Sequence, residues 1–475
     1  MNLRFLLALL VLSACTATKQ SRLTPDATTD NLKKHIAYLA DDKLEGRRIG
    51  TPGEKLAKDY ILGEFSLLGL EPMISGSFSQ PFQVYDGRQP DDKNYLIINN
   101  ISLSWGTEYF TFPASPKATI DALPAVALQE YGMPWFVDLK ELLEENKQNP
   151  HFDLNDALVK EVKKAGGKGA SAIIFYNSSS IDDKLKYDAK DKTPTLPIPA
   201  YYITKSANHY ISDKAATFSL KLNVSIAEKE RTGYNVVGYI NNNAPTTVII
   251  GAHFDHLGYG EDGNSRHTSH EPAIHNGADD NASGTAALIE VARQLKKSKA
   301  RNNNYVFIAF SGEELGLFGS KYFTEHPTVD LKTVNYMINM DMVGRLNDST
   351  KVLTIGGYGT SPEWSKYIKP DYFETEHADA KTAPSLVIRF DSSGTGPSDH
   401  TSFYRKDIPV LFYFTGLHTD YHKPSDDADK INYEGERVII GHILKLITAL
   451  DSAPRLAFLK TRETQTTTSA RFSVS

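Results

Sequence analysis

The chain has 475 residues, of which 40% are hydrophobic and 10% aromatic, and its formal net charge is −6. This length allows a large hydrophobic core and more than one domain, and the composition is typical of a globular protein. The mild negative charge argues against a nucleic-acid-binding protein, which usually carries a basic patch or stripe.

The first 15 residues predict an export signal that is not part of the fold. Arg4 precedes an apolar stretch over residues 5–12, which is too short to span a bilayer as a helix. The stretch ends in the letters LSAC at Cys15, which resemble a bacterial lipobox. By that resemblance Cys15 would be lipidated and would anchor the exported protein to the membrane. Thr16, which is not aspartate, favours the outer membrane; an ordinary signal peptide with an incidental cysteine is the alternative.

Cys15 is the only cysteine of the chain, so no internal disulfide is expected and the core and bound metals must stabilise the fold. A polar stretch over residues 21–30 is expected to be a tether, and residues 26–94 are expected to begin the main domain. Apolar side chains at helical spacing predict helices over residues 31–39 and 56–65. Turn-forming glycine and proline residues separate them over residues 42–53.

Residues 95–228 differ in composition from the rest and contain strand-like runs punctuated by proline. A short helix is expected over residues 158–164 and buried strands over residues 169–176 and 196–203. This combination resembles a protease-associated domain, so we expect a β-rich domain of that type inserted into the main one. The residues in this region contain no metal-ligand cluster.

Residues 229–455 alternate strands and helices, which predicts an α/β fold with a mostly parallel central sheet and helices on both faces. Residues 456–475 are rich in threonine and serine and are expected to be a flexible tail. The expected strands cover residues 247–252, 305–310, 334–338, 352–355, 386–390 and 409–414, and the expected helices cover residues 286–295, 317–323 and 436–450.

Five short segments that contain acids and histidines follow or border these apolar runs. They read GAHFDH at residues 251–256, GADDNASG at 277–284, SGEE at 311–314, NMD at 339–341 and YH at 421–422. Oxygen and imidazole ligands without thiolate suit zinc, with manganese and cobalt as alternatives. Because ligands bind beyond the carboxyl ends of the strands in an open α/β sheet, we expect these segments to meet at one edge.

The order and context of the five segments resemble the dinuclear zinc aminopeptidase family, which is related to glutamate carboxypeptidases and glutaminyl cyclases. The resemblance covers about residues 30–90 and 230–450. It implies an exported, zinc-dependent exopeptidase that acts on peptides and removes their N-terminal residues. The implied mechanism is attack on the scissile carbonyl by a hydroxide that bridges two zinc ions.

The same resemblance implies which residues hold the two zinc ions. His253 and Asp341 would bind one ion, Glu314 and His422 would bind the other, and Asp280 would bridge both. Three carboxylates and two imidazoles around two dications leave a roughly charge-balanced site. Without the ions the acidic ligands would repel one another, so the metal-free site should be less stable.

Three further residues acquire roles from the resemblance. Glu313 would be the general base that takes a proton from the bridging water and returns it to the leaving amine. Asp255 would hydrogen-bond His253 and fix its tautomer. Tyr421 either donates a hydrogen bond to the developing oxyanion, as in some relatives, or packs as an ordinary aromatic residue.

Several nearby residues leave alternatives open. Asp280 could be a helix N-cap as well as a ligand, Asp279 lies beside it, and His418 lies close to His422. The segment Ser398-Asp399-His400 either orients the site and lines its pocket or forms an ordinary loop. The polar loop after His256 is interpreted as shaping the mouth of the pocket, without metal ligands of its own. Its histidines are His267, His270 and His275.

Other functions on the same fold remain open at this stage. A carboxypeptidase would need a cationic pocket for the terminal carboxylate, for which Arg345 and Arg389 are available. A glutaminyl cyclase normally needs one metal ion, so the five-ligand set argues against it. A non-catalytic binding homologue is the third alternative, and the presence of Glu313 argues against that.

Overall fold

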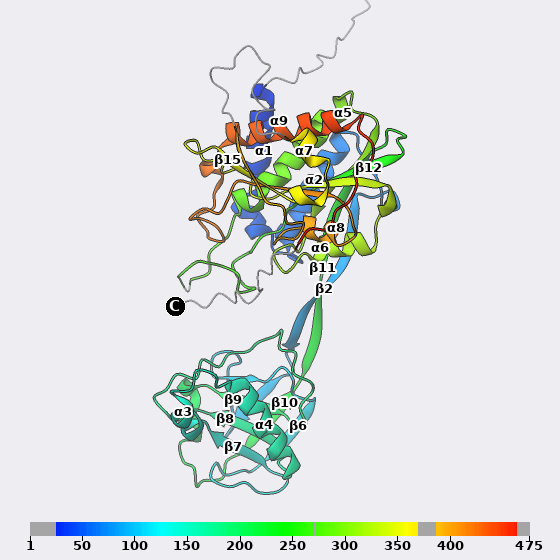
Figure 1. The fold of residues 1–475 in the computed structure, drawn as a ribbon. Coiled ribbons are helices and arrows are strands. Elements are labelled where there is room, and N and C mark those ends of the chain that lie inside the picture. The colour runs from blue at the N-terminus through cyan, green and yellow to red at the C-terminus, as the bar shows by residue number, and fades with distance from the viewer. Residues whose placement is uncertain (1–24, 270, 369–385, 463–475) are drawn as a thin grey trace, which may run out of the picture. The chain divides into compact units, whose positions relative to one another are not determined.

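The computed structural model describes residues 25–269, 271–368 and 386–462. The export signal and Cys15 therefore lie outside the described residues, as does His270. The chain forms two compact units, one made of the residues up to Phe82 and from Gly233 onward, the other of Gln83–Thr232 (Figure 1). Strands β2 (Ser79–Pro90) and β11 (Ile226–Ile240) carry the chain from one unit to the other. Within the described ranges, the helices are too short or too polar to cross a membrane.

The first unit is built on a nine-stranded mixed sheet, in the order β1-β11-β13-β12-β14-β17-β15-β16, with β2 also paired to β11. Its centre, from β13 to β17, is parallel, whereas the pairs β11–β13 and β15–β17 are antiparallel. This confirms the predicted α/β class. The strands are β1 (Glu71–Pro72), β12 (Thr246–His253), β13 (Asn303–Phe310), β14 (Val334–Met340), β15 (Val352–Gly356), β16 (Val387–Phe390) and β17 (Val410–Phe414).

Helices cover both faces of this sheet. Because successive strand residues point to opposite faces, Val248 and Ile250 of β12 join one core and Ile249 joins another. Helices α1, α5 and α9 pack together over the first core (Figure 1), and α6 and α8 contribute to the second. The helices are α1 (Pro25–Leu39), α2 (Pro52–Leu67), α5 (Gly284–Lys297), α6 (Phe318–Glu325), α7 (Trp364–Tyr367), α8 (His400–Tyr404) and α9 (Tyr433–Leu450).

The expected tether over residues 21–30 is wrong for its second half, because α1 already begins at Pro25. Its polar residues are bound by other helices: Thr28 donates a hydrogen bond to Glu290 and Thr29 donates one to Glu434. The segment between α1 and α2 contains the short 3-10 helix η1 (Asp42–Arg47). Helix α2 then begins behind Thr51, whose side chain accepts from the backbone of Glu54.

The second unit contains two four-stranded sheets and two helices. The first sheet has the order β4-β3-β10-β6 and the second has the order β5-β9-β8-β7. The expected helix at 158–164 lies within α4, whereas the two expected strands begin three and four residues before β8 and β9 and end with them. The elements are β3 (Tyr95–Ile98), β4 (Ile101–Ser102), β5 (Tyr109–Thr111), β6 (Ala118–Ala122), β7 (Pro134–Asp138), α3 (Lys140–Asn146), α4 (Leu154–Gly167), β8 (Ala172–Tyr176), β9 (Ala200–Ile203), η2 (Lys205–Ile211) and β10 (Leu220–Val224).

The beginning of the expected C-terminal tail packs on the first unit. Leu456 is buried, and its backbone N–H donates to the side chain of Asn335. The backbone N–H of Leu459 donates to the carbonyl of Thr360. Residues 463–475 lie outside the described part of the chain.

Candidate metal centre

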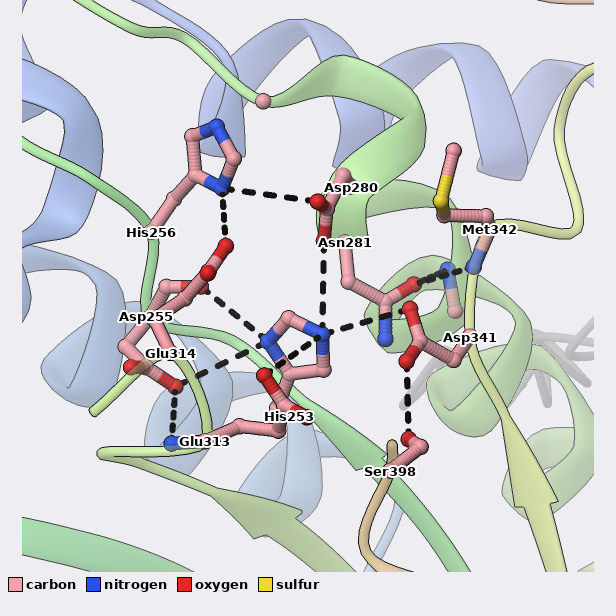
Figure 2. Close-up of polar contacts among 12 residues, drawn as sticks. His253, Asp255, His256, Asp280, Asn281, Glu313, Glu314, Asp341, Met342 and Ser398 are labelled. Atoms are coloured by element: carbon pink, nitrogen blue, oxygen red, sulfur yellow. Dashed lines mark hydrogen bonds and ion pairs between the residues drawn. The ribbon is translucent and has the colours of Figure 1, made fainter. Parts of the chain in front are cut away.

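The sheet brings the five expected ligands to one edge of the first unit. His253 is the last residue of β12, Asp341 directly follows β14, and Glu314 follows β13. These three strands are neighbours and run parallel, so their carboxyl ends meet at the same edge. Asp280 comes from the irregular helical turn η3 (Ala278–Ser283), which leads into α5. Figure 2 shows His253 in the middle of this group, facing Asp280 and Asp341.

The ligand atoms form two clusters that share one carboxylate. In the first, His253 Nε2 lies 3.2 Å from Asp341 Oδ1 and 3.4 Å from Asp280 Oδ1. In the second, His422 Nε2 lies 3.2 Å from Glu314 Oε2 and 3.3 Å from Asp280 Oδ2. Asp280 therefore offers one oxygen to each cluster, as a carboxylate that bridges two ions would.

The spacing within each cluster fits a zinc ion. Zinc–ligand bonds of about 2.0–2.1 Å in a tetrahedron put neighbouring ligand atoms roughly 3.3 Å apart. The four distances above lie between 3.2 and 3.4 Å. One ligand atom from each of His253, Asp280 and Asp341 lies within 4.8 Å of the other two.

The tautomers of the two histidines point to cations as well. His253 Nδ1 lies 3.2 Å from the carbonyl oxygen of Asp255, and His422 Nδ1 lies 2.9 Å from that of Asn264. A carbonyl oxygen only accepts hydrogen bonds, so each Nδ1 carries a proton and each neutral ring turns a lone pair at Nε2 toward carboxylate oxygens. A cation between Nε2 and the carboxylate oxygens, or a second proton on each ring, removes the repulsion between these electron pairs.

The charges of the site favour cation binding. Although burial alone lowers the pKa of His253, the carboxylates of Asp341 and Glu313 raise it well above its usual value. Burial acts to raise the pKa of Glu314, but hydrogen bonds from His256 and His422 hold it at about 2. Glu314 therefore stays ionised at neutral pH, and the centre is a buried concentration of negative charge.

His256 was not assigned a role from the sequence, yet it borders the second cluster. Its Nδ1 lies 2.8 Å from Glu314 Oε1 and 4.0 Å from Asp280 Oδ2. One ligand atom from each of His256, Asp280 and Glu314 lies within 4.8 Å of the other two. His422 Nε2 lies closer to Asp280, at a distance nearer the tetrahedral edge, and so fits the ligand position better. His256 instead contacts Oε1 of Glu314, the oxygen that does not face His422. The signal was the second histidine of GAHFDH, three residues after His253.

Glu313 lies beside the first cluster, with Oε2 4.0 Å from His253 Nε2. Burial, followed by the charges of Asp341 and Glu314, raises its pKa well above the usual value. Its backbone N–H donates to Asp255 Oδ1 at 3.2 Å. The Asp255 carboxylate lies 3.6 Å from His253 Nδ1, whereas the Asp255 carbonyl oxygen lies 3.2 Å from the same atom. Asp255 therefore contacts both His253 and Glu313.

Ser398, whose role the sequence left open, makes polar contacts beside the first cluster. Its hydroxyl donates to Asp341 Oδ2 at 2.7 Å (Figure 2). It also accepts from the amide of Asn339 at 2.8 Å. The hydroxyl therefore fixes the carboxylate whose other oxygen faces His253. Its neighbour Asp399 is fully buried, and burial raises the pKa of that carboxyl to about 7. His400 is buried with its ring stacked on Phe412.

The open alternatives beside Asp280 and His422 have partners of their own. His418 Nε2 lies 3.2 Å from Asp279 Oδ2, and Asp279 Oδ1 accepts from the backbone of Gly344. The side chains of His418 and Asp279 therefore face each other. Tyr421 stacks on the ring of His422, with the centroids 3.9 Å apart. Burial, with the charges of the surrounding acids, raises the Tyr421 pKa, so this hydroxyl keeps its proton at neutral pH.

The polar loop after His256 contacts the second cluster with its main chain. His267 and His275 lie outside helices and strands, as expected. His275 is satisfied within the loop, because Nδ1 donates to Ala273 O and Nε2 accepts from the Ser265 hydroxyl. The Asn264 side chain donates to the Glu314 carbonyl at 3.3 Å, in addition to the contact of its own carbonyl with His422.

Comparisons with known proteins add to this geometry. Residues 235–447 match the model of peptidase family M28. The chain is 25% identical over 405 residues to the probable lipoprotein aminopeptidase LpqL of Mycobacterium tuberculosis, which covers 82% of this chain and 74% of LpqL. It is 29% identical over 293 residues to aminopeptidase YwaD of Bacillus subtilis, which covers 58% of this chain and 56% of YwaD.

Similar solved structures include an aminopeptidase from Aneurinibacillus sp. strain AM-1. That structure is 22% identical, with 92% of this chain and 96% of that chain covered and a TM-score of 0.48. A zinc aminopeptidase from Bacillus subtilis is 20% identical, with 90% and 95% covered and a TM-score of 0.48.

Proposed function

We propose that the chain, whose residues 235–447 match the model of peptidase family M28, is a zinc-dependent aminopeptidase that removes N-terminal residues from peptides. The observation that carries the proposal is the pair of ligand clusters joined through Asp280. LpqL and YwaD, which resemble the chain, are both named aminopeptidases.

We assign His253 and Asp341 to one zinc ion, Glu314 and His422 to the other, and Asp280 to both. When bound, the two ions would lower the pKa of a shared water and polarise the scissile carbonyl. Manganese and cobalt accept the same ligand types. The second histidine of the GAHFDH motif, His256, would hold the Glu314 carboxylate in the orientation that its ion requires.

Glu313 is the proposed proton carrier. Its carboxylate would take a proton from the attacking water and deliver it to the nitrogen of the leaving amine. Its position beside the first cluster supports this role, with Oε2 4.0 Å from His253 Nε2, and burial raises its pKa above the usual value, which makes the carboxylate a stronger base. The contact of Asp255 with the Glu313 backbone would keep the carboxylate beside the scissile bond.

Tyr421 is the proposed donor to the oxyanion that develops on the scissile carbonyl. Its hydroxyl keeps its proton at neutral pH, and its ring is held against His422. Both observations suit a hydrogen-bond donor that is preorganised beside the second ion.

Aminopeptidase activity is favoured over the alternatives by the surroundings of the site. A carboxypeptidase needs a cation to hold the terminal carboxylate, but Arg345 already contacts Asp420 at 3.1 Å and Asp426 at 3.9 Å. Arg389 lies exposed on β16. The two clusters argue against a glutaminyl cyclase with one ion, and the presence of Glu313 beside the first cluster argues against a binding homologue.

We also propose that Cys15 carries a lipid that anchors the enzyme to the cell envelope, with the outer membrane as its destination. The printed name of LpqL includes the word lipoprotein, which supports an anchor. The unit Gln83–Thr232, which contains the predicted insert at residues 95–228 and extends beyond it at both ends, is proposed to be an inserted protease-associated domain.

Zinc-loaded protein tests this function directly. It should release free amino acids from a panel of aminoacyl amides and unblocked peptides, and should not act on the same peptides after N-terminal acetylation. Release of C-terminal residues from the acetylated peptides would instead indicate a carboxypeptidase. Absence of hydrolysis across the panel would contradict the proposal.

A further inference from the structure

Arg47 is a buried cation whose hydrogen bonds all go to main-chain carbonyl oxygens. Its side chain is fully buried. Nε donates to Phe254 O at 2.7 Å, Nη2 donates to Gly277 O at 3.0 Å, and Nη1 donates to Asn276 O at 2.6 Å and to Leu39 O. Burying a charge away from water costs free energy, so its presence here calls for a reason beyond packing.

Three of the four carbonyl partners of Arg47 lie in the two segments that carry His253 and Asp280, and the fourth belongs to Leu39 at the end of α1. Phe254 lies between His253 and Asp255, and Gly277 lies three residues before Asp280. A guanidinium is planar and holds its five N–H donors in a fixed fork. One rigid group therefore joins the residue after β12 to the two residues that lead into the turn η3.

The backbone around Arg47 is also shaped for close contact with these segments. Glu45, Gly46 and Arg47 have φ values of 46°, 68° and 50° in succession, in the left-handed region that non-glycine residues rarely adopt. A Cβ atom at Gly46 would lie 2.5 Å from the carbonyl oxygen of His275 and 2.7 Å from that of Gly258. Such a conformation persists only where the surroundings fix it.

Main-chain hydrogen bonds join the same turn to the loop beyond His253. The N–H of Gly258 donates to Gly46 O at 3.1 Å, and the N–H of His256 donates to Arg47 O at 3.4 Å.

Burial lowers the pKa of Arg47 to about 10, with Asp255 and Asp280 acting to raise it, so the guanidinium stays charged at neutral pH. Its charge therefore offsets part of the negative charge of the centre.

We propose that Arg47 is a positioning residue of the metal centre, which fixes the separation between His253 and Asp280 by holding both ligand-bearing segments with one guanidinium. The inference rests on the proposed zinc sites. It extends the functional machinery to a turn outside the residues that match the family model, which begin at residue 235.

Substitution of Arg47 tests this role through metal binding. The Arg47→Met variant should bind zinc about tenfold or more weakly in competition with a chelator, which is the effect expected from the loss of a group that orients ligands. Arg47→Lys keeps the charge but loses the fork, and its affinity should fall between those of Arg47→Met and the unsubstituted protein. The matched control is Arg437→Met, because Arg437 pairs with Glu434 on the surface of α9.

Two measurements separate positioning from a general effect on folding. The absorption spectrum of the cobalt-loaded Arg47→Met variant should differ from that of the unsubstituted protein, because altered ligand geometry changes the bands. Millimolar guanidinium should restore zinc affinity to an Arg47→Ala variant.

Unchanged zinc affinity and an unchanged cobalt spectrum in folded Arg47→Met protein would overturn the inference. So would a loss of affinity that follows only the loss of folded protein, measured by circular dichroism, with no rescue by guanidinium. If the unsubstituted protein binds no zinc, the proposed function itself fails, so the two failures are distinguishable.

Discussion

His422 donates a hydrogen bond from Nδ1 to the carbonyl oxygen of Asn264 at 2.9 Å, although 158 residues separate them in the chain. The N–H of Arg266 returns a hydrogen bond to the carbonyl of His422, and its guanidinium lies over the ring of Tyr421, 4.7 Å from the centroid. The polar loop after His256 thus holds the segment that supplies a proposed ligand. The contact between Asn264 and His422 fixes the His422 tautomer in which Nε2 is available to a metal ion.

The two histidines beside Glu314 should differ in their effect on zinc content. Replacing His422 with glutamine should leave about one zinc ion per chain, because the second cluster loses a direct ligand. Replacing His256 with glutamine should leave two ions, with the second bound about 10- to 100-fold more weakly, since His256 only orients Glu314. Metal analysis after dialysis measures both, and the reverse order of effects would make His256 the ligand.

Removing the proposed proton carrier should affect turnover more than binding. We expect Glu313→Gln to lower kcat by roughly 10²- to 10⁴-fold, the usual contribution of general acid–base catalysis, with a nearly unchanged KM and zinc content. Steady-state kinetics on an aminoacyl amide provide the measurement. The exposed Glu325→Gln serves as the matched control and should retain full activity. A Glu313→Gln variant with normal kcat would remove this residue from the mechanism.

Ser398 should matter for the first zinc ion. Its hydroxyl orients Asp341, so Ser398→Ala should weaken that ion by about 10- to 100-fold while the fold is retained. Chelator competition monitored at both sites checks this result. Ser365→Ala, which removes an exposed hydroxyl bonded to a backbone carbonyl, should bind zinc normally. Equal affinities in the two variants would show that the Ser398 contact is without consequence.

Acid should destabilise the metal-free protein partly through His442. This side chain is buried on α9 against the hydroxyl of Tyr413, and burial lowers its pKa from 6.5 to about 3. Because the unfolded chain takes up the proton first, the stability contributed by neutral His442 is present above pH 6.5. It is lost as the pH falls from 6.5 toward 3, by up to about 1.4 kcal/mol per pH unit.

His442→Gln should therefore show a shallower fall in unfolding free energy between pH 6.5 and 4.5 than the unsubstituted chain. Chemical unfolding of the metal-free proteins at several pH values gives the comparison. His209→Gln removes an exposed histidine and should leave the pH dependence as it is. A slope in His442→Gln that matches the unsubstituted chain would contradict the assignment.

The parallel core of the sheet could be predicted from the sequence because its strands are continuous apolar runs. The expected strands at 247–252, 305–310 and 334–338 correspond to β12, β13 and β14, each fully or almost fully buried. Ligands directly after such strands had to converge, since parallel neighbours end at the same edge. The convergence of His253, Asp341 and Glu314 was predictable for that reason.

Features that depend on tertiary contacts could not be predicted in the same way. The first turns of α1 are polar, and their hydrogen bonds to Glu290 and Glu434 hold a helix that begins at Pro25. From the sequence, Arg47 was placed only within a turn. Its partners are main-chain carbonyl oxygens, which every residue type carries, so the sequence does not mark them. The role of Asn264 could not be predicted either, because its main-chain carbonyl contacts His422 and any residue type could make that contact.

The most direct test of the account is a crystal structure of zinc-loaded protein with anomalous scattering measured at the zinc edge. The account predicts two peaks per chain, one among His253, Asp280 and Asp341 and one among Asp280, Glu314 and His422. A single peak, or zinc bound away from Asp280, would contradict it.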